Sequence, residues 1–171
     1  MFGLVNEYEE RAMTEQNDVQ IGFDFDTHRL QAIEKYQKVR PLYAEYASVI
    51  RNVLSEAFNA QFIKIHSIEA RAKAINSFGD KAASPSPNDP NKPYYPNPLS
   101  DITDLAGVRV IVFFPRTLNM VDSIIRTQFD VIEKSDKTLI LLKEGKFGYG
   151  SIHYLVRLKE NRINLLEYSR F

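Results

Sequence analysis

Two lysines and a serine recur every four residues in the first half of the chain, as Lys73, Ser77 and Lys81, and Arg71 stands just before them. On a helix, residues four apart lie along one stripe. Ammonium groups, a hydroxyl and a guanidinium near a helix N-terminus would form a receptor for a polyphosphate, because charge, hydrogen-bond donors and the helix dipole act together. From spacing alone, the plainer alternative is an ordinary solvated helix face.

A carboxylate precedes an apolar run that contains an arginine. Asp104 lies just before residues 107–114, and Arg109 lies within them. A guanidinium in an apolar strand needs a partner or a wet surface, because it stays charged. One interpretation is a buried ion pair of Arg109 with a carboxylate such as Asp104. The other is a magnesium-binding Asp104 beside a nucleotide-contacting arginine, since magnesium takes one or two protein carboxylates together with phosphate oxygens.

A third group of candidate residues lies near the end of the sequence: Lys146, Gly148, Tyr149, Ser151 and His153. The glycines that flank Tyr149 free the backbone there, so that its ring can project as a platform for a base. His153 lies two residues after Ser151, on the same side of a strand, and can donate to a phosphate or ribose oxygen. The alternative is a glycine-rich turn with a packed tyrosine and a satisfied histidine.

In this order, the three groups resemble the synthetase domain of the RelA/SpoT family, including its small alarmone synthetases and its toxic members. The matching strings are IEARAKAINSFGDKA, ITDLAGVRVI and GYGSIHY, and the similarity covers roughly residues 36–171. Together with the order of the expected elements, it implies an α/β (α+β) fold, with a mixed β-sheet of about five strands flanked by helices, like other nucleotidyltransferases.

The resemblance also implies a role for each matching position. The ATP-binding residues would be Arg71, Lys73, Ser77, Lys81 and Arg109. The two arginines would hold the adenine between their guanidinium planes, and the other three would contact phosphates. The acceptor-binding residues would be Lys146, Gly148, Tyr149, Ser151 and His153. Asp104 would be the magnesium ligand, and the catalytic residues would be Asp104, Arg109 and Lys81.

The implied reaction moves the β,γ-pyrophosphate of ATP, with Mg²⁺ as cofactor, to the 3′-hydroxyl of GTP or GDP, making the alarmone (p)ppGpp. The first alternative is a toxin that modifies the 3′ CCA end of tRNA. Its local cues are a basic cluster near the proline-rich segment (Lys64, Arg71, Lys73 and Lys81) and the pair Tyr94-Tyr95, which could stack on bases. Further alternatives are a non-catalytic nucleotide-binding module and a purely structural domain. The residues leave open an antitoxin, a C-terminal regulatory domain and a homo-oligomer.

The sequence departs from the family pattern in one place. A Glu-x-Gln-x-Arg strand follows the Gly-Tyr motif in the family and supplies a second carboxylate, whereas Glu167 is followed here by Tyr-Ser-Arg. The expectation is a chain that stops early, before its last strand and C-terminal helices. Without the second carboxylate, catalysis would be at risk while nucleotide binding would be retained.

Composition sets the class of protein. The 171 residues are 44% hydrophobic, with 22 Lys plus Arg against 22 Asp plus Glu. This length suits one domain, and we expect a tail or weak helix at residues 1–26 and a RelA/SpoT-like domain at 27–171. The balanced charge disfavours binding to nucleic acid through bulk charge. The absence of cysteine, of a signal peptide and of a long apolar run predicts a cytoplasmic protein with no membrane contact.

Apolar periodicity predicts the elements that position these residues. A helical pattern begins at Thr27, which can cap it together with Asp26, and Pro41 predicts either two helices or a kink near Arg40. A short strand is expected at residues 62–65 and a helix at about 72–83. The proline-rich segment 83–99 is expected to be a loop of polyproline character. A helix is predicted at 118–129. Strands are predicted at 107–114 (central in its sheet), 131–132, 138–142 and 152–158.

Overall fold

The structure, a computed structural model, describes residues 22–136 and 151–163. Its elements are α1 (Phe25–Ala60), β1 (Ser67–Ala72), α2 (Ile75–Ala82), β2 (Pro85–Ser86), β3 (Asp89–Pro93), α3 (Pro98–Asp101), β4 (Ala106–Ile111), α4 (Thr117–Gln128), β5 (Phe129–Asp136), β6 (Ile152–Leu158) and α6 (Glu160–Ile163). This mixture of helices and strands confirms the α+β class. The described strands pair as three two-stranded antiparallel sheets, β1–β4, β2–β3 and β5–β6, where we had expected one mixed sheet.

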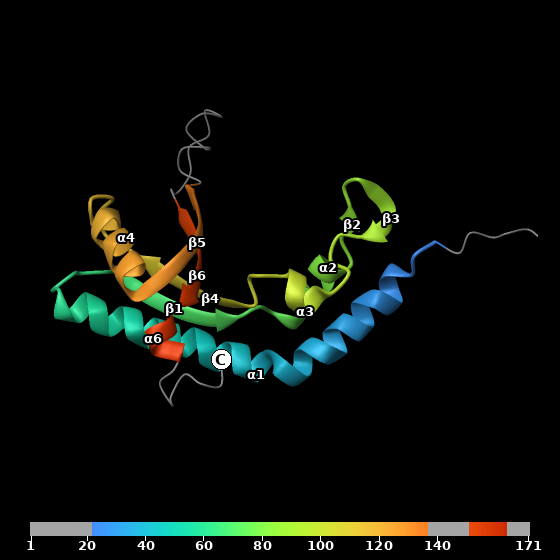
Figure 1. The fold of residues 1–171 in the computed structure, drawn as a ribbon, viewed down its shortest axis with the longest axis horizontal. Coiled ribbons are helices and arrows are strands. Elements are labelled where there is room, and N and C mark those ends of the chain that lie inside the picture. The colour runs from blue at the N-terminus through green and yellow to red at the C-terminus, as the bar shows by residue number, and fades with distance from the viewer. Residues whose placement is uncertain (1–21, 137–150, 164–171) are drawn as a thin grey trace, which may run out of the picture.

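Helix α1 runs along the length of the molecule, and the three sheets with α2, α3 and α4 lie on one side of it (Figure 1). It begins two residues before the predicted start, because Asp24 is the N-cap and its carboxylate accepts a hydrogen bond of 2.9 Å from the amide of Thr27. Pro41 lies inside this helix. Figure 1 shows the helix bending near its middle, which agrees with the predicted kink.

Each half of α1 supports its own hydrophobic core. The second half packs in a cluster that consists of Ile50, Val53, Leu54, Phe58, Ile63, Val121, Ile124, Phe129 and Leu158. The first half packs in a cluster that consists of Ala32, Tyr36, Phe78, Ala82, Ile102 and Leu105. Gly79 lets α2 approach α1 closely, since a Cβ at this position would lie 2.5 Å from the Cδ1 atom of Ile33. The elements therefore divide into two groups, with α2, α3 and β2–β3 near one end of α1 and α4 with β5–β6 near the other (Figure 1).

The first strand does not lie where the sequence predicted it. Residues 62–65 are not a strand, because the chain reverses direction after α1, and β1 begins only at Ser67. Strand β4 is shorter than predicted, ending at Ile111, and among the described strands it pairs with β1 alone. One face of this sheet packs on α1 through Ile68, Val108 and Val110.

The proline-rich segment is also more ordered than a polyproline loop. It forms the β2–β3 hairpin, in which Pro85 lies opposite Pro93, and the single-turn helix α3. The amide of Tyr94 closes the hairpin on the carbonyl of Ser84 at 2.8 Å. The prediction of a loop was wrong because a two-stranded hairpin has only edge strands, where a residue without an amide hydrogen is tolerated.

The remaining predictions fare better. Helix α4 and strand β6 lie where the periodicity placed them, and β5 extends well beyond residues 131–132. The strand predicted at 138–142 lies outside the described residues. No helix among the described residues has the length and apolar character of a membrane span.

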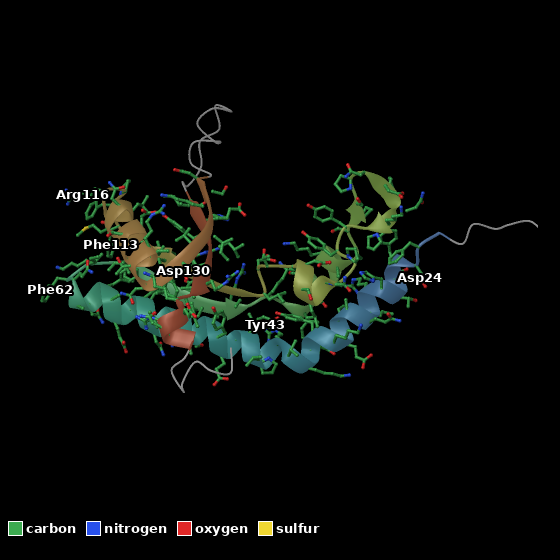
Figure 2. All side chains as sticks on the ribbon, in the orientation of Figure 1. Asp24, Tyr43, Phe62, Phe113, Arg116 and Asp130 are labelled. Atoms are coloured by element: carbon green, nitrogen blue, oxygen red, sulfur yellow. The ribbon has the colours of Figure 1, made fainter. Side chains whose placement is uncertain are left out.

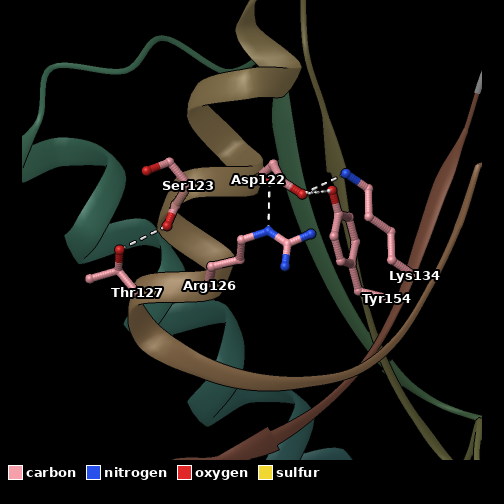
Figure 3. Close-up of polar contacts among 6 residues, drawn as sticks. All are labelled: Asp122, Ser123, Arg126, Thr127, Lys134 and Tyr154. Atoms are coloured by element: carbon pink, nitrogen blue, oxygen red, sulfur yellow. Dashed lines mark hydrogen bonds and ion pairs between the residues drawn. The ribbon is translucent and has the colours of Figure 1, made fainter.

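Asp122 on α4 ties this helix to the β5–β6 sheet (Figure 3). Its carboxylate accepts hydrogen bonds from Lys134 at 2.8 Å, Tyr154 at 2.6 Å and Arg126 at 2.9 Å. These donors, with Lys134 contributing most, hold the pKa of Asp122 far below its ordinary value of 3.8.

The hydrogen bonds to Asp122 should make the stability of the fold depend on pH in the acidic range. A carboxyl group whose pKa is lowered by folding stabilises the protein above its unfolded pKa, and this contribution is lost as the pH falls through the folded pKa. From about pH 5 to about pH 2, the thermal midpoint of the wild type should therefore fall more steeply than that of Asp122→Asn. Asp130→Asn, at an exposed carboxylate on β5, is the control and should follow the wild type in scanning calorimetry.

Candidate functional site

Three of the predicted site residues meet in one ion-paired group. Asp104 accepts from the ammonium of Lys73 at 2.8 Å through Oδ2, and from that of Lys81 at 3.0 Å through Oδ1. The predicted helical stripe is only partly correct, because Lys73 precedes α2 and lies in its connection to β1. Asp104 comes from the segment before β4. Residues from three separate segments therefore meet here, and we call Lys73, Lys81 and Asp104 the Asp104 group.

Charge pairing outweighs burial within the Asp104 group. Partial burial raises the pKa of Asp104. The hydrogen bonds and charges of the two lysines together lower this pKa by more than burial raises it, so the net shift is downward. For Lys81 burial acts to lower the pKa, and Asp104 reverses this and raises it. These shifts favour the charged forms of Asp104 and Lys81. One carboxylate can neutralise only one of the two ammonium charges.

Helix α1 fixes the backbone at Lys73. The hydroxyl of Tyr36 and Nε of Arg40 both donate to the carbonyl of Lys73, at 2.9 and 3.1 Å. On the other side, the amide of Lys73 donates to the carbonyl of Leu105 at 2.9 Å. Lys73 is thus held from α1 and from the residue after Asp104. Neither Tyr36 nor Arg40 belonged to the predicted site, since the periodicity assigned Tyr36 to the apolar core and no short-range pattern links residues more than thirty positions apart.

Removing the Tyr36 hydroxyl should loosen this arrangement. In Tyr36→Phe the carbonyl of Lys73 keeps Arg40 as a donor, so we expect a loss of only about 1 kcal/mol in the free energy of unfolding. The larger effect should be on ligand affinity, because Lys73 is less well placed. Denaturant unfolding with calorimetric titration of ATP measures both, and Tyr43→Phe is the matched control on the same helix. Equal ATP affinity of the two variants would contradict the positioning role of Tyr36.

Arg71 and Arg109 lie on the same face of the β1–β4 sheet. Arg71 stands opposite Gly107, and Arg109 stands opposite Glu69. Residues directly opposite each other in an antiparallel pair share a face, which makes the two arginines diagonal neighbours about 7–8 Å apart at the backbone. This face points away from α1, and both arginines are exposed. A Cβ on Gly107 would meet no atom within 4 Å, so the sheet is open beside Arg71.

The interpretation of Arg109 as half of a buried ion pair is wrong. Asp104 pairs with the two lysines, and the side chains of Arg71 and Arg109 make no hydrogen bond or ion pair within the described ranges 22–136 and 151–163. The outward register of β4 gives Arg109 a wet surface, which removes the cost of burying its charge.

Ser77 and Lys81 lie one turn apart on α2. Ser77 is exposed in the first turn, and no side chain of the described part of the chain caps this end of the helix. Lys81 also lies over the ring of Tyr95, 5.5 Å from its centroid. The N-terminal amides of α2 and the hydroxyl of Ser77 are thus oriented donors near the Asp104 group.

The predicted acceptor residues are only partly described. Ser151 and His153 lie at the start of β6, both exposed, with 3.3 Å between the serine hydroxyl and Nε2 of the histidine. They belong to the β5–β6 sheet rather than to the β1–β4 sheet that carries the two arginines. Lys146, Gly148 and Tyr149 lie outside the described residues.

The carboxylate of Asp104 fits a magnesium ion whose other ligands come from a bound nucleotide and from water. Its side chain is 54% exposed, and both oxygens now accept from ammonium groups that a cation would replace. In residues 22–136 and 151–163 no three acidic, histidine or cysteine side chains converge as metal ligands. Asp104 can therefore supply one ligand, and the remaining ligands would be phosphate oxygens and water.

Comparison with known proteins supports the resemblance drawn from the motifs. Residues 70–167 match the family model described as a region found in RelA/SpoT proteins. No curated protein and no solved structure matches the chain. The matched region covers more than half of the chain and includes every predicted site residue. The chain therefore belongs to the RelA/SpoT family, which indicates pyrophosphotransferase activity of the (p)ppGpp synthetase type.

Proposed function

We propose that this protein transfers the β,γ-pyrophosphate of ATP to the 3′-hydroxyl of GDP or GTP. The ribose 3′-oxygen attacks the β-phosphorus and its hydroxyl proton passes to water, the bond from that phosphorus to the α–β bridging oxygen breaks, and AMP leaves with the bond electrons. The observation that carries the proposal is the Asp104 group, in which two ammonium groups and a carboxylate meet beside α2. Such transfers depend mainly on positioning and charge stabilisation.

The exposed arginines fit the adenine of ATP. A ring stacked between two guanidinium planes needs them about 7 Å apart, since each stacked contact takes about 3.5 Å. The diagonal placement of Arg71 and Arg109 puts their backbones at a similar separation, and Gly107 leaves the sheet open beside Arg71. The adenine would therefore lie on the outward face of β1–β4.

The phosphates would then extend toward the Asp104 group. The ammonium groups of Lys73 and Lys81 would exchange their bonds to Asp104 for bonds to phosphate oxygens, and Ser77 would donate from α2. Asp104, freed from the lysines, would hold Mg²⁺. When bound, magnesium neutralises phosphate charge and orients the transferred group. The lysines would hold the same phosphates from the side of α2.

For the acceptor, we propose that His153 and Ser151 hold phosphate or ribose oxygens of the guanine nucleotide. Both are exposed at the start of β6. Lys146, Gly148 and Tyr149 are included in this acceptor site because of the family motif.

The 3′-terminal adenosine of tRNA is the alternative acceptor. One of its cues in the sequence is weakened, because Lys64 follows the C-terminal end of α1, whereas Tyr94 and Tyr95 follow the β2–β3 hairpin at the opposite end of the molecule (Figure 1).

Incubation with ATP labelled on the γ-phosphate separates these activities. The protein is offered GDP, GTP or bulk tRNA, and the products are resolved by chromatography and gel electrophoresis. We expect labelled guanosine tetra- and pentaphosphate together with unlabelled AMP. Label found only in tRNA would replace the alarmone assignment with the toxin assignment. Nucleotide affinity without turnover, measured by calorimetry, would identify a non-catalytic binding module.

A further inference from the structure

An exposed aromatic patch lies at the end of the molecule formed by the C-terminus of α1. Its rings belong to Phe62, Phe113 and Phe114, which are 92%, 58% and 57% exposed. They come from two connections, residues 61–66 between α1 and β1 and residues 112–116 between β4 and α4. Figure 2 shows Phe62 and Phe113 at the same end as Arg116. We call these three rings, together with Lys64, His66 and Arg116, the end patch.

Phe62 occupies a backbone position that favours glycine. Its φ of 54° is the only positive value among the described non-glycine residues. The amides of Phe62 and Ile63 donate to the carbonyls of Asn59 and Phe58, at 3.1 and 2.9 Å. This is the pattern that ends many helices with a left-handed glycine. The chain therefore tolerates backbone strain to present an aromatic ring that makes almost no contact with the protein.

Each ring of the end patch has a basic residue close to it in sequence or in space. His66 and Phe113 contact each other with centroids 5.2 Å apart, and the guanidinium of Arg116 lies 5.0 Å from the centroid of Phe114. Lys64 is exposed two residues after Phe62. The amide of His66 donates to the carbonyl of Ile111 at 2.8 Å, which joins the two connections. Neither connection contains Asp or Glu, although the chain as a whole balances acidic and basic residues.

We propose that the end patch binds single-stranded nucleic acid. Exposed rings beside the cations Lys64 and Arg116 match the composition of a nucleotide, which has one base that stacks and one phosphate that attracts a cation. Phe113 and Phe114 contact each other, with centroids 6.5 Å apart, and Arg116 borders them, whereas charged residues as a class are depleted in the core of a protein interface. The patch lies beyond the end of β4, so binding there would not require ATP or an acceptor nucleotide. The proposal therefore stands or falls independently of the proposed reaction.

The test uses fluorescence anisotropy with an unstructured, end-labelled oligoribonucleotide of about 12 nucleotides, without ATP. We expect binding of the single strand and much weaker binding of a duplex of the same sequence. Phe62→Gly should weaken binding roughly ten-fold, because a stacked base is lost. The same variant should raise the thermal midpoint, because glycine relieves the left-handed backbone. Loss of binding therefore could not be attributed to unfolding.

The charged part of the patch gives a second readout. Arg116→Gln should reduce the slope of log affinity against log salt by about 0.7, the value for one phosphate contact on a single strand. Leu30→Ala, at a side chain 63% exposed on the first half of α1, is the apolar control and should bind like the wild type. A deoxyoligonucleotide of the same sequence tells whether RNA or DNA is preferred.

Three results would overturn the proposal. The first is unchanged binding by Phe62→Gly, and the second is equal affinity for duplex and single strand. The third is a dimer in sedimentation that Phe62→Gly dissociates, with no oligonucleotide binding by either form. That last result would assign the end patch to a second copy of the chain.

Discussion

Asp104→Asn should reduce the rate of pyrophosphate transfer by about 10²–10³-fold, the loss that follows removal of one preorganised electrostatic partner. The amide is nearly the same size as the carboxylate, so packing is preserved. The variant loses the proposed magnesium ligand, and Lys73 and Lys81 lose the anion that holds both ammonium groups in place. The measurement is release of AMP and formation of the labelled guanine nucleotide at saturating substrate.

Asp80→Asn is the matched control for this experiment. Asp80 is also an exposed aspartate with a basic partner, since it accepts from Arg29 at 2.9 Å, and it lies on α2 next to Lys81. Its removal should leave turnover within a small factor of the wild type. Near-full activity of Asp104→Asn, or equal losses in the two variants, would contradict the role of Asp104.

Phe78→Ala should cost about 3–5 kcal/mol in the free energy of unfolding, as large-to-small changes at buried aromatic residues do. Phe78 is fully buried and stacks on Tyr36, with ring centroids 4.2 Å apart and planes 24° from parallel. The cavity would open beneath the first half of α1. Because a domain of this size is stabilised by about 5–15 kcal/mol, the change removes a large share of the total, and denaturant unfolding measures it.

A volume-conserving variant separates packing from function. Phe78→Leu should cost less than half as much, because leucine fills most of the space. Both variants should weaken ATP binding in proportion to the disturbance of Tyr36, whose hydroxyl holds Lys73. An Ala variant as stable as the Leu variant would show that Phe78 is not the centre of this cluster.

The parts of the fold that follow from sequence are those set by local periodicity. In the long helix, in α4 and in β6, the apolar residues recur with the period of the helix or strand that forms. The bend of the long helix follows from Pro41. The sequence placed Lys73 and Lys81 in one motif and Asp104 in another, and the structure brings the three residues together. Family motifs carried this information, because spacing alone equally described a solvated helix face.

The features that could not be predicted from the sequence depend on contacts between segments far apart in the chain. Residues of β1 read as Ser-Ile-Glu-Ala-Arg-Ala, which locally favour a helix, and only pairing with β4 makes them a strand. That pairing places Arg71 on a sheet face rather than on a helix, and its register turns Arg109 outward. The hydrogen bonds from Tyr36 and Arg40 to the carbonyl of Lys73 likewise join segments that no short-range sequence pattern connects.

The bend of α1 has a geometric consequence for the proposed reaction. Helix α2, which carries the proposed ATP-binding residues Ser77 and Lys81, packs on the first half of this helix through Phe78 and Ala82, while the β5–β6 sheet that carries His153 packs near the second half. In the proposed reaction, the angle between the two halves would therefore set the distance between the pyrophosphate donor and its acceptor. Pro41 has no reactive group, but by bending α1 it would determine the separation of the two substrates.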